Sequence, residues 1–231
     1  MLLMIKKHNV ISLKAKRMTR YRVTATLLNS WQRIFDAKYD VKESEKDEVS
    51  LETKIQAEMD NRKEEFIKLL KRIPTPDNEF MKKGREFEDI VCRGGDPEFS
   101  PVVNNGVFQV KVQRDVDIDG VPLTLYGVLD VLKAGRIMDI KRVVRYSYGK
   151  YKTSHQHSMY LFLVPEALDF TYLICDDNIE SDNLEKRYSA YHYENYIREN
   201  SEDILTTISQ FLSWLKANDL FHLFIQNWAM R

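Results

Sequence analysis

Two aspartates fall within one predicted β-hairpin of the 231-residue chain. If Ala134-Gly135 forms a two-residue loop, Lys133 pairs with Arg136, and Asp130 then stands directly opposite Asp139. Opposed side chains on one sheet face lie about 5 Å apart at Cβ. Two carboxylates at that distance repel each other unless they share a proton or hold a cation between them. The hairpin therefore predicts a paired carboxylate site.

A lysine two residues after the second aspartate belongs to the same predicted site. Strand alternation places Asp139 and Lys141 on one face and Ile140 on the other. Oxygen ligands at this density suit Mg²⁺ or Mn²⁺, which bind a few carboxylates and complete their coordination with water and substrate phosphate. The alternative is a charge pair on a surface hairpin, because Asp/Glu-x-Lys triplets occur at four places in the chain. Only the triplet at Asp139 lies in an apolar strand, where an unpaired carboxylate would be costly. The other three begin at Asp36, Asp40 and Glu52.

Three features outside the hairpin extend this site. Glu88 lies on a predicted helix that packs through Phe87 and Val91 just before the sheet, so its carboxylate could be a third metal ligand. Gln156 and Tyr160 are four residues apart on the helix that follows the Asp-Ile-Lys strand, and they share a face of that helix. The same strand leads into a basic, aromatic stretch suited to phosphate contacts and base stacking. Its candidate DNA-binding residues are Arg142, Arg145, Tyr148, Lys150 and Lys152.

These residues form an ordered set of four short motifs. The motifs are Gly84-x-x-Phe87-Glu88, Gly127-x-x-Asp130, Asp139-x-Lys141 and Gln156-x-x-x-Tyr160. The set resembles the PD-(D/E)XK nuclease superfamily, and specifically its RecB-like and phage-type exonuclease branch, over roughly residues 77–175. A helical lead-in around residues 24–35 is also similar to the start of such domains. The chain differs from many RecB-like members in having Arg142 after the motif lysine, instead of Thr or Ser, and Glu88 instead of His.

The resemblance implies a divalent-metal-dependent nuclease in which Glu88, Asp130 and Asp139 bind the metal and Lys141 is catalytic. It also implies an orienting role for Gln156 and Tyr160. We expect the Ile140 carbonyl to complete the metal ligands, and the cofactor to be Mg²⁺ or Mn²⁺. We expect Lys141 to position the attacking water, or to help deprotonate it if its apolar setting depresses its pKa.

Three hypotheses about function follow from these residues. The leading one is a DNA exonuclease of a phage or prophage recombination system. The alternatives are a catalytically silent nuclease fold that serves as a DNA-binding or assembly module, and a structure-selective endonuclease. The intact set of Asp130, Asp139 and Lys141 favours an enzyme. DNA is the expected partner, while a homo-oligomer and a recombination partner protein are left open.

Hydrophobic spacing predicts an α/β (α+β) framework for the site. With the resemblance, we expect a restriction-endonuclease-like core, in which helices flank a central mixed β-sheet, with helical additions at both ends. We expect one domain over 1–231, made of a helical lead-in at 1–76, a catalytic core at 77–193 and C-terminal helices at 194–231. Predicted helices cover 24–35, 51–73, 77–93, 153–164, 204–215 and 220–228, and predicted strands cover 107–114, 121–132, 136–144, 168–175 and 187–193.

Composition limits the classes of partner and cofactor. The 35 Lys and Arg residues balance 35 Asp and Glu residues, which excludes a strongly basic, non-specific DNA binder. The charges are nevertheless segregated, because residues 133–152 hold seven basic residues and one acidic residue beside the predicted site. Cys92 and Cys175 are too few for a four-thiolate iron–sulfur cluster and are predicted to be reduced core residues. With no apolar run of membrane-spanning length, we expect no membrane partner and a cytoplasmic protein in a bacterial or phage-infected cell.

Overall fold

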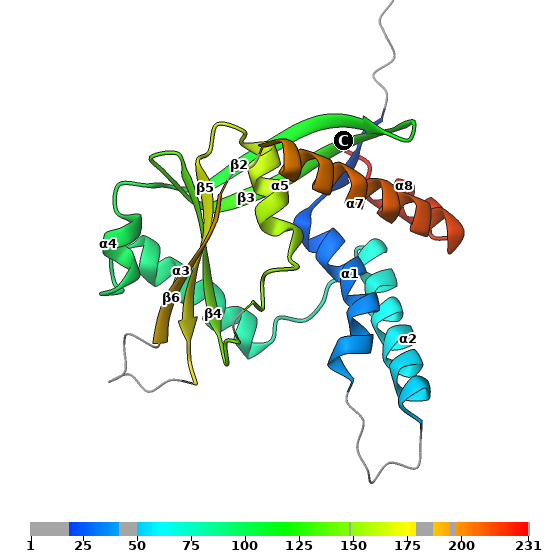
Figure 1. The fold of residues 1–231 in the computed structure, drawn as a ribbon, viewed down its shortest axis with the longest axis horizontal. Coiled ribbons are helices and arrows are strands. Elements are labelled where there is room, and N and C mark those ends of the chain that lie inside the picture. Colours follow the sequence, from blue (N-terminus) through cyan, green and yellow to red (C-terminus); the bar gives the residue numbers. More distant parts are fainter. Residues whose placement is uncertain (1–18, 42–49, 148, 179–186, 195–196, 231) are drawn as a thin grey trace, which may run out of the picture.

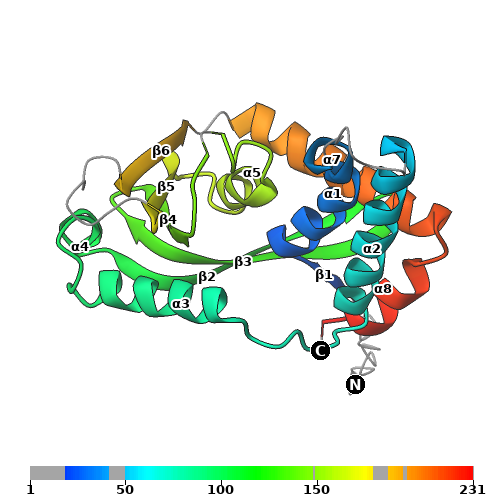
Figure 2. The ribbon, with the colours of Figure 1, turned by 90° about the horizontal axis from the view of Figure 1, so that it is seen from below.

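A computed structural model describes the chain as a central β-sheet with helices packed on both faces (Figures 1 and 2). This arrangement confirms the predicted α/β class with a mixed sheet flanked by helices. The ranges that the structure describes are 19–41, 50–147, 149–178, 187–194 and 197–230. Tyr148, a predicted DNA-binding residue, lies outside them.

Six strands form one mixed sheet in the order β1-β3-β4-β5-β6, with β2 paired to β3 outside that path. The β1–β3 and β4–β5 pairs are parallel, and the other three pairs are antiparallel. A parallel pair needs a long crossover, and α5 provides the one between β4 and β5. The strands are β1 Tyr21–Val23, β2 Val107–Ile118, β3 Val121–Lys133, β4 Arg136–Val143, β5 Asp169–Asp176 and β6 Tyr188–Glu194.

Two tight turns set the register of the predicted meander β2-β3-β4. Asp119-Gly120 has φ angles of 51° and 75°, and Ala134-Gly135 has φ angles of 49° and 78°. Both residues of each turn are thus in the left-handed region, which matches the twist of the strands that they join. Lys133 pairs with Arg136, as the sequence predicts.

Most helices begin and end close to their predicted boundaries. Thr24, Asn78 and Ser154 are the N-caps of α1, α3 and α5, and each side chain accepts a backbone N–H of the first turn. Two elements were not predicted: the short helix α4 and the strand β1, which lies in the segment expected to be a helical lead-in. In the part of the chain that is described, no helix is long and apolar enough to cross a membrane. The helices are α1 Ala25–Asp40, α2 Leu51–Leu70, α3 Glu79–Cys92, α4 Phe99–Val103, α5 His155–Leu163, α7 Ile197–Ala217 and α8 Phe221–Asn227.

The sheet separates two apolar cores. The larger core contains buried residues of α1, α2, α5, α7 and α8, whereas α3 and α4 pack on the opposite face in the smaller one (Figure 2). Neighbouring β4 residues belong to different cores, since Ile137 is in the larger and Met138 and Ile140 are in the smaller. Cys92 and Cys175 are both free thiols in or against the smaller core.

The two ends of the described chain meet at β1. The backbone N–H of Arg22 donates to the carbonyl of Trp228 over 2.8 Å, and the N–H of Met230 donates to the carbonyl of Arg20, also over 2.8 Å. Tyr21 and Ala229 form an isolated antiparallel bridge. Strand β1 is therefore bonded to β3 on one side and to the C-terminal segment on the other.

Candidate active site

The predicted pair of aspartates lies where β3 and β4 separate. Their ladder runs from the turn to the pair Val131–Met138 and ends there. Asp130 and Asp139, which the sequence predicts to stand directly opposite each other, each lie one residue beyond this last pair and are not themselves a ladder pair. Beyond the ladder, Asp130 Oδ2 accepts a hydrogen bond of 2.9 Å from the backbone N–H of Ile140. A carboxylate thus takes the place of a strand-to-strand bond at this point.

Asp139 is the most enclosed of the site carboxylates, with 1% of its surface exposed. Its Oδ2 lies 2.5 Å from Nζ of Lys141, and its Oδ1 accepts a hydrogen bond from Nε2 of Gln156 on α5. The Ile140 side chain packs in the smaller core on the opposite face. The predicted alternation, with Asp139 and Lys141 on one face and Ile140 on the other, is therefore confirmed.

Glu88 approaches the site from α3, on the opposite face of the sheet from α5 (Figure 2). Its Oε1 accepts a hydrogen bond from Nε2 of Gln109 on β2. Gln109 has a φ of 53°, and the β2–β3 ladder omits the position where it would pair with Asp130. Strand β3 is thus interrupted on both sides at Asp130. Sequence analysis missed Gln109, because nothing in an alternating strand pattern marks a left-handed residue.

Burial and mutual repulsion raise the pKa values of two carboxyl groups of the site, those of Asp130 and Glu88. Burial raises the pKa of Asp130 to about 8, and the charges of Asp139 and Glu88 add to that rise while Lys141 opposes it. Burial, followed by the charge of Asp139, also raises the pKa of Glu88. Such crowded carboxyl groups need a proton or a cation to lower their free energy.

Two aspartates keep Lys141 a cation. Burial alone would lower its pKa, but the carboxylates of Asp139 and Asp130 outweigh burial and raise it above the ordinary lysine value. The condition under which Lys141 would help to deprotonate the water, a depressed pKa, is therefore not met, because two anions face the ammonium group. The other predicted role, positioning the water, stays a prediction.

Tyr160 connects two of the sequence motifs by packing. Its hydroxyl donates a hydrogen bond of 3.1 Å to the carbonyl of Val128 on β3. Its ring lies so close to Gly127 that a Cβ atom there would stand 2.5 Å from a ring carbon. Burial raises the pKa of Tyr160 to about 12, so the phenol keeps its proton. A side chain at Gly127 would therefore clash with the ring of Tyr160, so the Gly-x-x-Asp motif requires a glycine at this position because of the tyrosine of Gln-x-x-x-Tyr.

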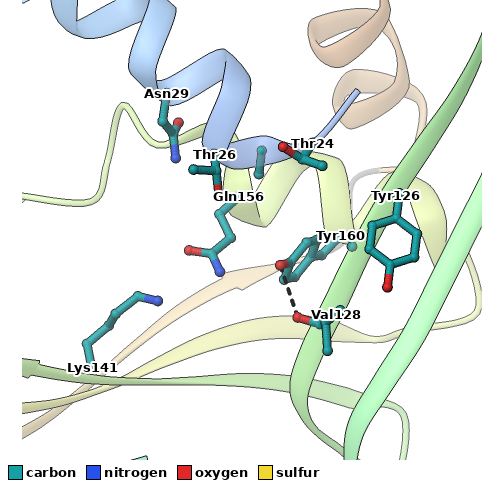
Figure 3. A pocket seen from close by; sticks show the side chains of 10 residues that line it. Thr24, Thr26, Asn29, Tyr126, Val128, Lys141, Gln156 and Tyr160 are labelled. Carbon is teal, nitrogen blue, oxygen red and sulfur yellow. Dashed lines mark hydrogen bonds between the residues drawn. The ribbon is translucent and has the colours of Figure 1, made fainter. Parts of the chain in front are cut away.

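A cavity of about 330 Å³ is lined by Lys141 and Gln156, the two residues that contact Asp139 (Figure 3). Lys141, Gln156 and Tyr160 line one part of it, and the start of α1 lines another. Lys141 and Gln156 point into this space in Figure 3. The residues contributed by α1 and its N-cap are Thr24, Ala25, Thr26 and Asn29.

The predicted DNA-binding residues fall into two groups. Arg142 is engaged within the protein, because its Nε donates to both carboxylate oxygens of Asp177 over 3.1 and 2.9 Å. Arg145, Lys150 and Lys152 are exposed on the loop between β4 and α5. This exposed group is the part of the basic stretch that remains available to a ligand.

Two tyrosines of the same loop, Tyr146 and Tyr151, pack into the protein. Tyr151 stacks on Tyr146 and on Tyr172 of β5, with ring centroids 6.2 and 4.8 Å apart. Tyr146 also contacts Tyr191 of β6, at 5.2 Å between centroids. This packing fixes the base of the loop beside Lys141. Burial raises the pKa of Tyr151, and the positive charge of Lys141 opposes that rise.

The donor atoms of the site suit a hard divalent cation, since they are carboxyl oxygens whose pKa values are raised by burial and by each other's charge. Their present contacts are with protein groups, namely Lys141, Gln156, Gln109 and the Ile140 N–H. Within the described ranges, no three His, Cys, Asp or Glu side chains converge closely enough to hold a metal as they stand. The chemistry of the ligands therefore fits Mg²⁺, while the side chains would have to exchange partners to bind it.

Comparison with known proteins gives only loose structural likenesses. No protein-family model matches the chain, and no curated protein matches it in sequence. The crystal structure of SSO0001 is similar with a TM-score of 0.46 and 15% identity, covering 86% of this chain and 79% of that one. A Eubacterium rectale protein described as a "Putative exonuclease" is similar with a TM-score of 0.45 and 17% identity, covering 91% of this chain and 86% of that one. Neither likeness carries weight for function.

Proposed function

We propose that this chain is a Mg²⁺-dependent deoxyribonuclease that degrades linear DNA from an end. The observation that carries the proposal is the meeting of Asp130, Asp139 and Lys141 at the separation of β3 and β4, beside the cavity. Two crowded carboxylates next to a fixed cation are suited to phosphodiester hydrolysis, where negative charge accumulates on the phosphate.

Asp130, Asp139 and the Ile140 carbonyl would hold the metal, and Glu88 would join them after leaving Gln109. When bound, Mg²⁺ lowers the pKa of a coordinated water and neutralises charge on the phosphate. Mn²⁺ prefers the same oxygen ligands and should substitute for it.

The remaining chemistry belongs to side chains of this protein. Lys141, a cation because of its two carboxylate neighbours, would orient the attacking water and hold charge on a phosphate oxygen. Gln156 fixes the orientation of Asp139, and Tyr160 fixes β3 beside it. Water adds to phosphorus as one P–O bond breaks, and the leaving oxygen takes up a proton. Arg145, Lys150 and Lys152 would contact the DNA backbone.

The test is incubation with end-labelled linear DNA and closed circular DNA in Mg²⁺, Mn²⁺ or EDTA. We expect loss of label from linear DNA alone, with no loss in EDTA. Asp139→Asn should lower the rate by more than about 100-fold, because it removes a ligand charge while keeping the shape. Asp60→Asn is the matched control, since Asp60 is exposed on α2 and bonds to Gln56.

Two other results would replace the proposal. Cleavage of closed circular DNA would make the protein an endonuclease. Absence of cleavage with either metal, together with salt-sensitive binding of DNA, would make it a catalytically silent binding module.

A further inference from the structure

Asn29 connects α1 to the start of the helix that carries Gln156. Its Oδ1 accepts a hydrogen bond of 2.8 Å from the backbone N–H of His155, the first residue of α5. Its Nδ2 donates a hydrogen bond of 3.2 Å to Oγ of Ser154, the N-cap of the same helix. Both polar ends of the Asn29 amide are therefore used to hold one helix terminus, 125 residues away in the chain.

The held terminus leads directly to the most enclosed carboxylate. Oγ of Ser154 accepts the backbone N–H of Gln156 over 3.2 Å, and the side chain of Gln156 donates to Oδ1 of Asp139. A continuous series of hydrogen bonds therefore runs from Asn29 on α1 to Asp139 on β4. Figure 3 shows Asn29 and Gln156 on the same side of the cavity, with Lys141 across from them.

We propose that Asn29 is a positioning residue for the candidate active site, acting on Asp139 through the N-terminus of α5 and Gln156. This inference rests on the proposed nuclease function. The first residues of α5 have no preceding helical turn to bond to, so their positions depend on capping groups. Loss of the Asn29 clamp would let Gln156 shift, and Asp139 would then lose the donor that fixes its orientation.

The location of Asn29 also allows a different role, because it lines the cavity and could touch the substrate itself. The two roles differ in their coupling to Gln156. A positioning residue has no further effect once Gln156 is removed, whereas a substrate contact contributes independently and adds its own effect. A double-mutant cycle therefore separates them.

The experiment compares the wild-type chain with Asn29→Leu, Gln156→Ala and the double variant in steady-state hydrolysis of linear DNA. We expect Asn29→Leu to lower kcat about tenfold, the lower end of the effect of removing an orienting partner, with KM for DNA nearly unchanged. In the Gln156→Ala background the same change should lower kcat less than twofold. Asn29→Asp keeps the acceptor for the His155 N–H and should recover most of the activity.

The matched control is Gln32→Ala, which removes an amide on the same helix whose hydrogen bond to Asp36 stays within α1. It should leave kcat and KM unchanged. If Asn29→Leu does not fold, Ser154→Ala breaks the same series of bonds and takes its place in the cycle. Additive losses in the double variant, or a loss confined to KM, would overturn the positioning role.

A second measurement remains informative if the chain does not cleave DNA. Amide hydrogen exchange of His155 should become at least about tenfold faster in Asn29→Leu, because that N–H loses its acceptor, and should not change in Gln32→Ala. Absence of cleavage by the wild-type chain would refute the proposed nuclease. Unchanged exchange at His155 would refute the clamp itself.

Discussion

Helices α5 and α3 bring side chains to the candidate site from opposite faces of the sheet. The two helices differ in how much of each is buried. Helix α5 is buried over seven consecutive residues, from His157 to Leu163, and its start is fixed by Asn29. Helix α3 buries only Phe87 and Val91 of its 14 residues. The bond from Gln156 to Asp139 is partly buried, whereas the bond from Gln109 to Glu88 is exposed.

This difference indicates a fixed side and an adjustable side of the site. Asp139 accepts a hydrogen bond from Gln156, which projects from the buried helix α5. Glu88 can exchange Gln109 for another partner at small cost, because an exposed hydrogen bond contributes little net free energy. A site of this kind can be ordered in advance at one carboxylate and still admit a cation at the other.

The largest effect is expected on the fixed side. Gln156→Ala should lower kcat for DNA hydrolysis about 10- to 100-fold, because Asp139 loses an orienting partner. Steady-state kinetics at saturating Mg²⁺ measures this, with Gln56→Ala on α2 as the control amide. A change of less than twofold would mean that α5 does not orient the site.

A smaller effect is expected on the adjustable side. Gln109→Ala should change kcat and the Mg²⁺ concentration for half-maximal activity by no more than about threefold, since it removes an exposed bond. Titration of activity with Mg²⁺ measures both quantities. If Gln109→Ala lowered kcat as much as Gln156→Ala, α3 and α5 would contribute equally to the site, and the distinction between an adjustable and a fixed side would be wrong.

A third effect, on stability and not on rate, is expected where the two sides meet. A carboxyl whose pKa is raised on folding costs stability, and this cost grows as the pH rises from the unfolded pKa, about 4, to the folded value of about 8 for Asp130. In EDTA at pH 8, Asp130→Asn should therefore raise the free energy of unfolding by about 1–2 kcal/mol. The gain should be smaller at pH 5. Urea unfolding at both values measures this, and an equal gain at both would contradict the explanation.

Sequence reasoning succeeded where the determinants are local. The Ala134-Gly135 turn has a preferred geometry that sets the pairing of its neighbours, so the approach of Asp130 to Asp139 follows from counting along two strands. The helix that presents Glu88 follows from the spacing of Phe87 and Val91 in the same way. The fold class and the central part of the site were accessible for this reason.

It failed where the determinants are distant in the chain. Asn29 meets Ser154 only after folding, and no pattern in either segment indicates the contact. Strand β1 is three residues long and pairs with β3 about 100 residues later, too short for a periodic signal. The raised pKa of Lys141 depends on the three-dimensional position of two anions, which a hydrophobicity pattern does not contain.

The pairing of β1 with the C-terminal segment has a consequence for synthesis on the ribosome. Strand β1 is synthesised before its partners. The backbone N–H of Arg22 and the carbonyl of Arg20 can form their hydrogen bonds only after Trp228 and Met230 have been made. Strand β1 leads directly into Thr24, the N-cap of α1, whose first turn forms part of the cavity wall. A nascent chain that has reached only α7 would have β1 paired with β3 alone, and the bonds on the other edge of β1 would form only when the 228–230 segment has been made.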